Sequence, residues 1–174
     1  ASQHTHSGKV GVLATPATFA GELYASVVER FAQNVKIYQS TCPGLVAQIE
    51  KGAMQSKKTR AILEEAIQPM LDEGVDRLVL GCTHYPFVIP QIEEILAGRA
   101  EVVDPAPAVA RQVKRVLESL DLLADPCAEG DLKFMTTASP DAFLNFLKMI
   151  DIAPAKVQTL NWQQGVLIQP KEGL

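Results

Sequence analysis

Short apolar runs alternate along the chain with segments in which apolar residues recur at helical spacing. The short runs are bounded by turn residues, which is typical of buried strands. We expect strands at 9–14, 35–38, 77–80, 101–103, 133–137 and 156–160. We expect helices at 19–31, 43–51, 56–72, 88–96 and 108–120, and a further helix that opens at Ser139 and Pro140. This alternation predicts an α/β fold, with a mainly parallel sheet covered by helices on both faces.

Several positions mark where these elements end. Ser56 is expected to cap the helix that follows it, and Gly52 is a typical helix exit. Pro69 should distort the last turn of the helix at 56–72. The stretch 121–131 has the character of an exposed loop, and the tail from Gln163 shows no pattern that predicts an element.

Composition bounds the size and class of the protein. The chain has 174 residues, of which 47% are hydrophobic, enough for one sizeable core or for a small domain plus part of another. The formal net charge of -4 does not favour nucleic acid or an anionic membrane, and no apolar run is long enough to span a bilayer. The three cysteines are widely spaced, which fits a reducing compartment better than a disulfide framework. Residues 1–8 are polar and lack the apolar core of a signal peptide, so we expect a cytoplasmic protein.

The same composition gives little support for a metal site. There is no CxxC pair and no HxxxH or HExxH pattern, and two of the three histidines, His4 and His6, lie in the polar leader. We therefore expect no bound metal. No GxGxxG or Walker motif is present either, so a nucleotide-binding domain has little support.

Ligands of parallel α/β sheets bind beyond the carboxyl ends of the strands. The candidate stretches are 15–18, 40–44, 81–86, 104–107 and 136–139. Only at Gly81-Cys82-Thr83-His84 do a thiol, a hydroxyl and an imidazole meet at such a strand end. Free N–H groups at the start of a following helix would favour a thiolate and would suit a carboxylate ligand. The competing interpretation is that Cys82 is an inert, small hydrophobic residue.

The longer string Val79-Leu-Gly-Cys-Thr-His-Tyr-Pro86 resembles the second catalytic motif of glutamate racemases, in the aspartate/glutamate racemase superfamily. Three other regions are similar to that family in order and spacing. They are the strand at 11–16, the stretch from Cys42-Pro43 to Gly52, and the later pieces at 103–105 and 134–137. The resemblance covers roughly residues 9 to 160, and the string at 79–86 is its most specific part.

The resemblance implies a cofactor-independent, two-thiol racemisation of glutamate in a three-layer racemase-like fold. One thiolate removes the α-proton and a second thiol returns a proton on the opposite face, so neither a metal nor another cofactor is expected. By resemblance, Cys82 is one acid/base, His84 assists it, and Glu50 orients His84. The substrate-binding residues implied are Thr83, Thr15 and Thr18. For Glu50 the alternative is an exposed helix carboxylate with no role.

The chain lacks two segments that the family carries in its first half. There is no Asp-Ser-Gly and no Cys-Asn-Thr, which would hold the opposite thiol. We therefore expect a C-terminal part of a racemase: a leader at 1–8, the second racemase-type domain at 9–103, a segment at 104–162 that in the family packs on the missing first domain, and a tail at 163–174. We expect such a chain alone to have no appreciable racemase activity.

Loss of the first domain should leave apolar side chains of the segment at 104–162 uncovered. We expect this for Val109, Val113, Val116, Leu117, Phe143, Phe146 and Leu147. Exposed patches of that size are usually covered. The expected partners are therefore a second copy of the chain or the missing N-terminal half, besides glutamate as substrate.

Two alternatives to a glutamate racemase remain at this stage. Another racemase of the superfamily, acting on aspartate or a hydantoin, shares the chemistry. A non-catalytic binding module that inherited the fold would explain the missing thiol. In the leading interpretation the product, D-glutamate, serves peptidoglycan synthesis in a bacterial cytoplasm.

Overall fold

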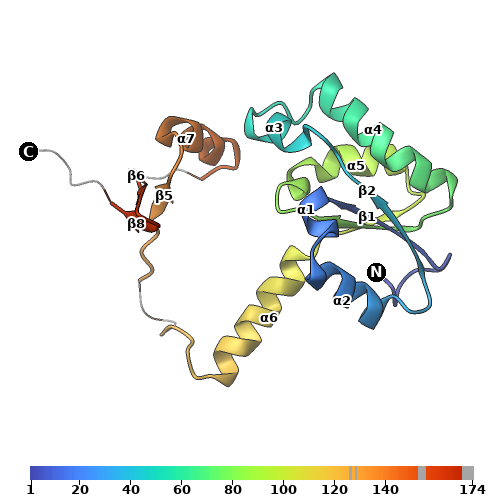
Figure 1. Ribbon diagram of the computed structural model, residues 1–174, viewed down its shortest axis with the longest axis horizontal. Coiled ribbons are helices and arrows are strands. Elements are labelled where there is room, and N and C mark those ends of the chain that lie inside the picture. Colours follow the sequence, from blue (N-terminus) through green and yellow to red (C-terminus); the bar gives the residue numbers. More distant parts are fainter. Residues whose placement is uncertain (126, 128, 153–155, 170–174) are drawn as a thin grey trace, which may run out of the picture. The chain divides into compact units, whose positions relative to one another are not determined.

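The computed structural model describes residues 1–125, 127, 129–152 and 156–169, and it forms two compact units. Unit 1 comprises Ala1–Leu122 and unit 2 comprises Leu123–Leu174. Figure 1 shows the elements of both units, most of them labelled. The division expected at residue 103 concerns packing within a longer racemase and stays a prediction. Residues 126 and 128 of the expected loop and 170–174 of the expected tail lie outside the described residues.

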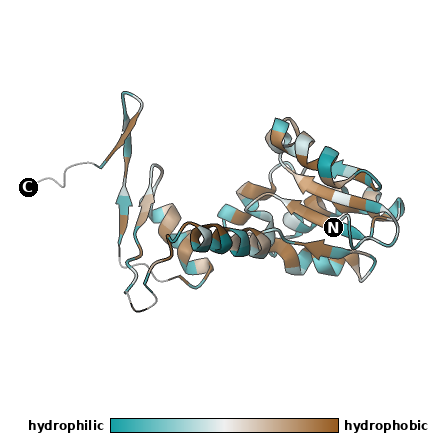
Figure 2. Cartoon of the chain, turned by 90° about the horizontal axis from the view of Figure 1, so that it is seen from below, coloured by the Kyte–Doolittle hydropathy of each residue, from teal (hydrophilic) through white to brown (hydrophobic). Residues whose placement is uncertain are grey.

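Unit 1 is built on a four-stranded sheet in the order β2-β1-β3-β4. The strands are β1 (Lys9–Ala14), β2 (Lys36–Ser40), β3 (Arg77–Gly81) and β4 (Glu101–Val103), and every pair is parallel. Parallel neighbours need crossover connections, which here run through helices. The apolar runs of the sequence become the central strands, and they appear mostly in the colour of hydrophobic residues in Figure 2. The predicted parallel α/β fold is confirmed.

One face of this sheet is tightly covered. It carries α3 (Leu45–Glu50), α4 (Lys57–Asp72) and α5 (Ile89–Leu96), whose inward side chains are fully buried. These include Leu45, Ile49, Leu63, Ile67, Ile92 and Leu96. A Cβ placed on Gly11 would lie only 2.8 Å from the Met70 sulfur, so α4 packs directly on the backbone of β1.

The opposite face is covered more loosely. The helix α2 (Glu22–Phe31) lies there but has no buried residue, and its Leu23, Val27 and Phe31 are exposed. Between α2 and the sheet is a cavity of about 270 Å³ lined by apolar side chains of both. Helices therefore lie on both faces, as predicted, but the two layers are packed to different extents.

Helix starts follow the expected capping residues, with one correction. The Ser56 hydroxyl accepts a hydrogen bond from the Thr59 N–H at 3.1 Å, and Ser139 caps α7 (Pro140–Met149) in the same way. The single helix expected at 19–31 is instead two helices, α1 (Pro16–Phe19) and α2. Thr15 and Pro16 begin the first helix early, and Gly21, with extended backbone, separates it from the second.

Unit 2 contains two small sheets. In the first, β5 (Phe134–Thr136) and β6 (Val157–Thr159) are parallel, and α7 lies between them in the chain. In the second, β7 (Asn161–Gln163) and β8 (Val166–Ile168) form an antiparallel hairpin that the sequence pattern did not predict. Gln164 and Gly165 both have positive φ, the backbone that two-residue hairpin turns require.

Of the apolar residues expected to be exposed in the segment at 104–162, those that are exposed lie on one helix. On α6 (Ala106–Ser119), Val109, Val113 and Val116 are exposed, and they share one face of the helix with Leu120. In unit 2 the expectation is wrong: Leu147 is 4% exposed, and the Phe143 ring packs edge-on against Phe134. Around α7, Leu147 is thus buried and Phe143 and Phe146 are half-buried, whereas Met135 and Met149 remain exposed; on α6, Leu117 is half-buried.

The first residues are tied to the start of β3. The Asp76 carboxylate accepts hydrogen bonds from the Thr5 hydroxyl and from the backbone N–H groups of His6 and Ser7. Partial burial alone would raise the pKa of Asp76, but the hydrogen bonds from these three residues outweigh it and hold the pKa well below its usual range.

Replacing Asp76 with Asn tests this link. Because the folded-state pKa is lowered, the ionised carboxylate stabilises the fold above the unfolded-state pKa of about 3.9, and this contribution is lost as pH falls below it. We expect Asp76→Asn to cost about 1 kcal/mol at pH 7 and progressively less below pH 4. Urea unfolding at several pH values measures this. Asp72→Asn, at an exposed position on α4, is the control, and an equal loss in both variants would contradict the assignment.

Substitution of Gly81 tests the close approach of β1 and β3. A Cβ at this position would lie 2.9 Å from the Ala14 Cβ and 3.2 Å from the Leu13 carbonyl oxygen, and neither atom can rotate away. We expect Gly81→Ala to lower the free energy of unfolding by about 1–3 kcal/mol. Gly130→Ala, where no atom lies within 4 Å, should change it little. Equal stability of the two variants would show that the strand ends have room.

Candidate active site

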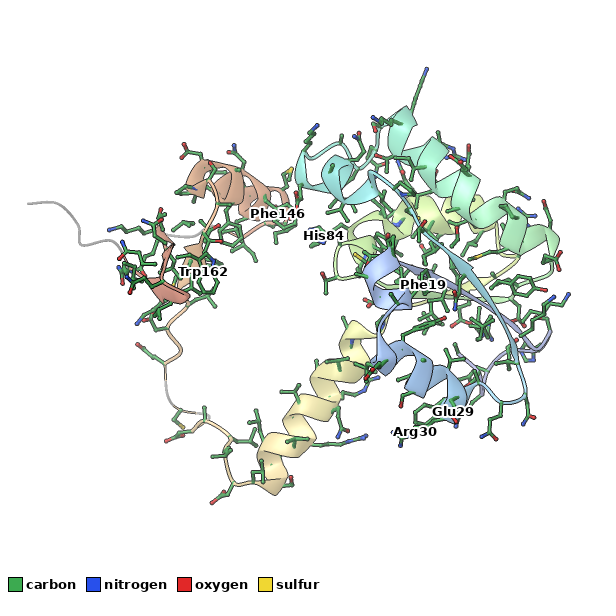
Figure 3. All side chains as sticks on the ribbon, viewed as in Figure 1. Phe19, Glu29, Arg30, His84, Phe146 and Trp162 are labelled. Atoms are coloured by element: carbon green, nitrogen blue, oxygen red, sulfur yellow. The ribbon has the colours of Figure 1, made fainter. Side chains whose placement is uncertain are left out.

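The loops that follow three neighbouring strands meet at one edge of the sheet of unit 1. The register pairs Ala14 with Gly81 and Leu13 with Ser40, so β1, β2 and β3 end at nearly the same level. The residues that follow are Thr15, Thr41-Cys42 and Cys82. His84 is labelled at this edge in Figure 3. The candidate stretches at 15–18, 40–44 and 81–86 are therefore brought together, as expected for the carboxyl ends of parallel strands.

Cys82 lies at the first position after β3, in a turn. Gly81 lets the end of β3 approach β1 closely, and the Cys82 carbonyl accepts a hydrogen bond from the Tyr85 N–H at 3.1 Å. The turn leads into the 3₁₀ helix η1 (Tyr85–Val88), and α5 begins only at Ile89. The helix expected to follow Cys82 therefore starts as a short 3₁₀ turn, and the α-helix predicted at 88–96 begins at Ile89.

His84 and Glu50 are in direct contact. The His84 Nε2 atom lies 3.1 Å from the Glu50 Oε1 atom, although the two residues are 34 positions apart in sequence. Glu50 is the last residue of α3, and His84 lies in the turn after β3. Their side chains are 31% and 60% exposed, so the pair stabilises the fold little and acts mainly on the orientation of the ring.

The hydroxyl residues expected at the site lie at the same edge. Thr15 caps α1: its hydroxyl accepts from the Thr18 N–H at 3.3 Å and lies 3.0 Å from the Thr18 hydroxyl. These two threonines are therefore linked to each other, and both are half-buried. Thr83 is exposed in the turn between Cys82 and His84. The structure places all three near Cys82 in the topology, while contact with a substrate stays a prediction.

The three cysteines differ in their surroundings. Cys42 is buried, and desolvation raises the pKa of its thiol to about 11, against an opposing effect of a hydrogen bond with Tyr85. Cys127 is exposed in unit 2, and Cys82 is half-buried. Burial likewise raises the pKa of the Tyr85 phenol well above its usual range. Cys82 is thus the cysteine of unit 1 that is both at the strand ends and partly open to solvent.

The contact between Cys42 and Tyr85 was not predicted from the sequence. In the sequence, Cys42 stood out only as the start of the stretch to Gly52 that resembles the family, and Tyr85 only as part of the string at 79–86. One feature of the sequence could have indicated such a contact. Tyr85 directly follows His84, and a buried tyrosine needs a hydrogen-bond partner for its hydroxyl.

Neither a metal cluster nor a membrane span is found in the described part of the chain. Across residues 1–125, 127, 129–152 and 156–169, His, Cys, Asp and Glu form no group of three suited to a metal ion. Within the same residues, every helix is too short or too polar to cross a bilayer.

Comparison with known proteins places this geometry in a family. The model of the Asp/Glu/Hydantoin racemase family matches residues 1–113. The chain belongs to this racemase family. The family match includes all three strand-end loops of unit 1, with Cys82, His84 and Glu50.

Individual relatives are glutamate racemases. The glutamate racemase of Roseiflexus sp. (strain RS-1) is 42% identical over 159 residues, covering 91% of this chain and 58% of the relative. That of Pseudomonas aeruginosa (strain UCBPP-PA14) is 41% identical, covering 92% and 60%. The chain thus spans about three fifths of the length of the curated relatives it matches.

Solved structures agree in fold. Glutamate racemase isoform RacE1 of Bacillus anthracis superposes with a TM-score of 0.79 at 24% identity, covering 94% of this chain and 60% of that one. The enzyme of Francisella tularensis, solved in complex with D-glutamate, gives 0.78 at 25% identity and covers 91% and 60%.

Alkylation with iodoacetamide tests the different surroundings of the cysteines. With a pKa raised from an ordinary 9.0 to about 11, the thiolate fraction of Cys42 at pH 8 falls from about one in ten to about one in a thousand on folding. We expect Cys42 to react at least about a hundredfold more slowly in the native chain than in urea, with Cys82 labelled in the native chain. Peptide mass analysis locates the label, and exposed Cys127 is the internal control. Fast native labelling of Cys42 would contradict its burial.

Proposed function

We propose that this chain carries one half of the catalytic apparatus of a glutamate racemase. The observation that supports this most is the half-buried thiol of Cys82 at the carboxyl edge of a parallel sheet, two residues from a histidine that Glu50 holds by hydrogen bond. Membership of the family and the identity to glutamate racemases support placing the reaction at this site.

In the proposed reaction the Cys82 thiolate removes the proton from the α-carbon of one glutamate enantiomer. The electron pair of the broken C–H bond is delocalised into the α-carboxylate, and Cys82 becomes a neutral thiol. A second thiol, from the part of the relatives that this chain does not match, then donates a proton to the opposite face of the planar carbon. The net change is inversion at one carbon, with one proton taken and one returned.

The other site residues have supporting roles in this proposal. His84 assists Cys82 as a proton partner, and Glu50 fixes the tautomer and direction of the imidazole. Thr83, Thr15 and Thr18 offer hydrogen-bond donors to the substrate carboxylates, which stabilise the developing charge best if they are preformed. The thiol chemistry is complete without pyridoxal phosphate or a metal, and D-glutamate would serve peptidoglycan synthesis in the cytoplasm of a bacterium.

The exposed face of α6 supports the proposal that a further surface completes the protein. Val109, Val113, Val116 and Leu120 recur at helical spacing and are each at least 44% exposed. We propose that the unmatched portion of a racemase chain, or a second copy of this chain, covers them.

A chimera tests the function. The portion of the Roseiflexus racemase that this chain does not match is joined to the chain, and D-glutamate formation from L-glutamate is measured. We expect turnover that Cys82→Ala lowers by at least about a thousandfold and Glu50→Gln by about ten- to a hundredfold. The unfused chain should form no D-glutamate, because one thiol cannot serve both faces.

Matched controls and outcomes separate the alternatives. Cys127→Ala, far from the site in sequence, should leave turnover unchanged. Turnover that survives Cys82→Ala would contradict the proposal, and a preference for aspartate would favour an aspartate racemase. A folded chimera with no turnover on either substrate would favour a binding module.

A further inference from the structure

Two consecutive residues of the turn after β3 reach opposite ends of one short helix. His84 contacts Glu50, the last residue of α3. Tyr85 contacts Cys42, whose carbonyl accepts the N–H of Leu45, the first residue of α3. With six residues at 1.5 Å each, the two ends of α3 are about 9 Å apart. The turn that holds Cys82 is thus attached to α3 at two points.

The attachment at Tyr85 is buried. Tyr85 is 2% exposed and Cys42 is 5% exposed. The Tyr85 phenol lies within hydrogen-bonding range of both the side chain and the backbone of Cys42. Burial disfavours the ionised forms of both groups, so both remain hydrogen-bond donors across the physiological range. Hydrogen bonds in such surroundings are well defined and costly to break.

The attachment at His84 is more open to solvent. The Glu50 side chain is 60% exposed, and an exposed pair of this kind contributes little energy by itself. It therefore cannot fix the turn without help, whereas the buried link can. The two contacts are made by neighbouring residues of the chain. The hydrogen bond from the Tyr85 N–H to the Cys82 carbonyl closes the turn that contains both.

We propose that Tyr85 is a positioning residue of the active site: its hydrogen bonds to Cys42 fix the turn 82–85 on the start of α3, and so bring His84 to Glu50 and set the direction of Cys82. The Cys42 thiol is then a structural acceptor rather than a second reacting thiol. This inference rests on the proposed function in taking Cys82 and His84 as the reacting groups.

Three variants of the 174-residue chain test the link. Tyr85→Phe keeps the ring and removes the hydroxyl. Cys42→Ala removes the sulfur acceptor, and Cys42→Ser replaces it with a hydroxyl that can accept the same bond. The measurements are the nuclear Overhauser contact between the His84 ring and the Glu50 side chain, the native-state rate of Cys82 alkylation, and the free energy of unfolding in urea.

We expect Tyr85→Phe and Cys42→Ala each to weaken the His84–Glu50 contact by about half and to raise the Cys82 alkylation rate about threefold, because the turn opens more often. Cys42→Ser should restore both values toward those of the parent. The double variant Tyr85→Phe/Cys42→Ala should resemble either single one, since all three break the same link.

If the Tyr85 ring only fills space in the core, the variants give a different result. Tyr85→Phe would then lower stability and leave the His84–Glu50 contact and the Cys82 rate unchanged, which overturns the proposal. Additive effects in the double variant would overturn it too. If Tyr85→Phe does not fold, the comparison of Cys42→Ala with Cys42→Ser decides alone. None of these readouts uses turnover, so failure of the racemase proposal in the chimera would be distinguishable from failure of this one.

Discussion

The close approach of two parallel strands at their carboxyl ends sets the geometry of the candidate site. At Gly81 there is no room for a side chain, because the Cβ of Ala14 and the carbonyl oxygen of Leu13 fill the space. The strand-end residues that follow, Thr15 and Cys82, are therefore placed by backbone packing rather than by bonds between their own side chains. A flexible loop could carry the same residues, but it would lose conformational entropy each time they assembled.

The turn after β3 makes one buried and one exposed contact, and the two are suited to different roles. The His84–Glu50 pair has the chemistry that a proton-transfer site needs, yet its exposure limits what it contributes to stability. The Tyr85–Cys42 contact has no role in the proposed proton transfer, yet its burial makes it well suited to hold a fixed geometry. An imidazole can remain open to substrate and proton exchange only if neighbouring residues supply the rigidity.

Local patterns predict elements well where one physical cause dominates. The strands at 9–14 and 101–103 match the observed β1 and β4 because each is a short apolar run between turn residues. The helix at 19–31 was wrong because apolar spacing continues across Gly21, while the backbone does not. The β7–β8 hairpin was missed because its strands have three residues each, too few to show alternation, and its turn depends on a positive φ at Gln164.

Contacts between distant residues are less accessible to such reasoning. The pairing of Glu50 with His84 was expected only through resemblance to glutamate racemases, since no periodicity relates residues 34 positions apart. The Tyr85–Cys42 contact was not foreseen at all, because nothing local distinguishes a buried cysteine that accepts a hydrogen bond from one that merely fills space. Topology supplies the missing information: it is the parallel order β2-β1-β3 that brings the loop with Cys42 to the loop with Tyr85.

The unequal cover of the two sheet faces bears on how a two-thiol reaction could be assembled. The helices α3 and α5, which frame the turn of Cys82, belong to the densely buried layer, whereas the opposite face is loosely covered by α2 over a cavity that Pro105, just before α6, also lines. The candidate site is therefore held by contacts internal to unit 1. Under the proposed mechanism, the part of the protein that carries the second thiol docks onto a site that is already ordered. The entropic cost of assembling the two thiols is then a cost of docking, and the turn of Cys82 need not become ordered at the same time. Such a division agrees with the exposure in unit 1, where the exposed large apolar residues among those described lie on α2 and on or just after α6, and not around Cys82.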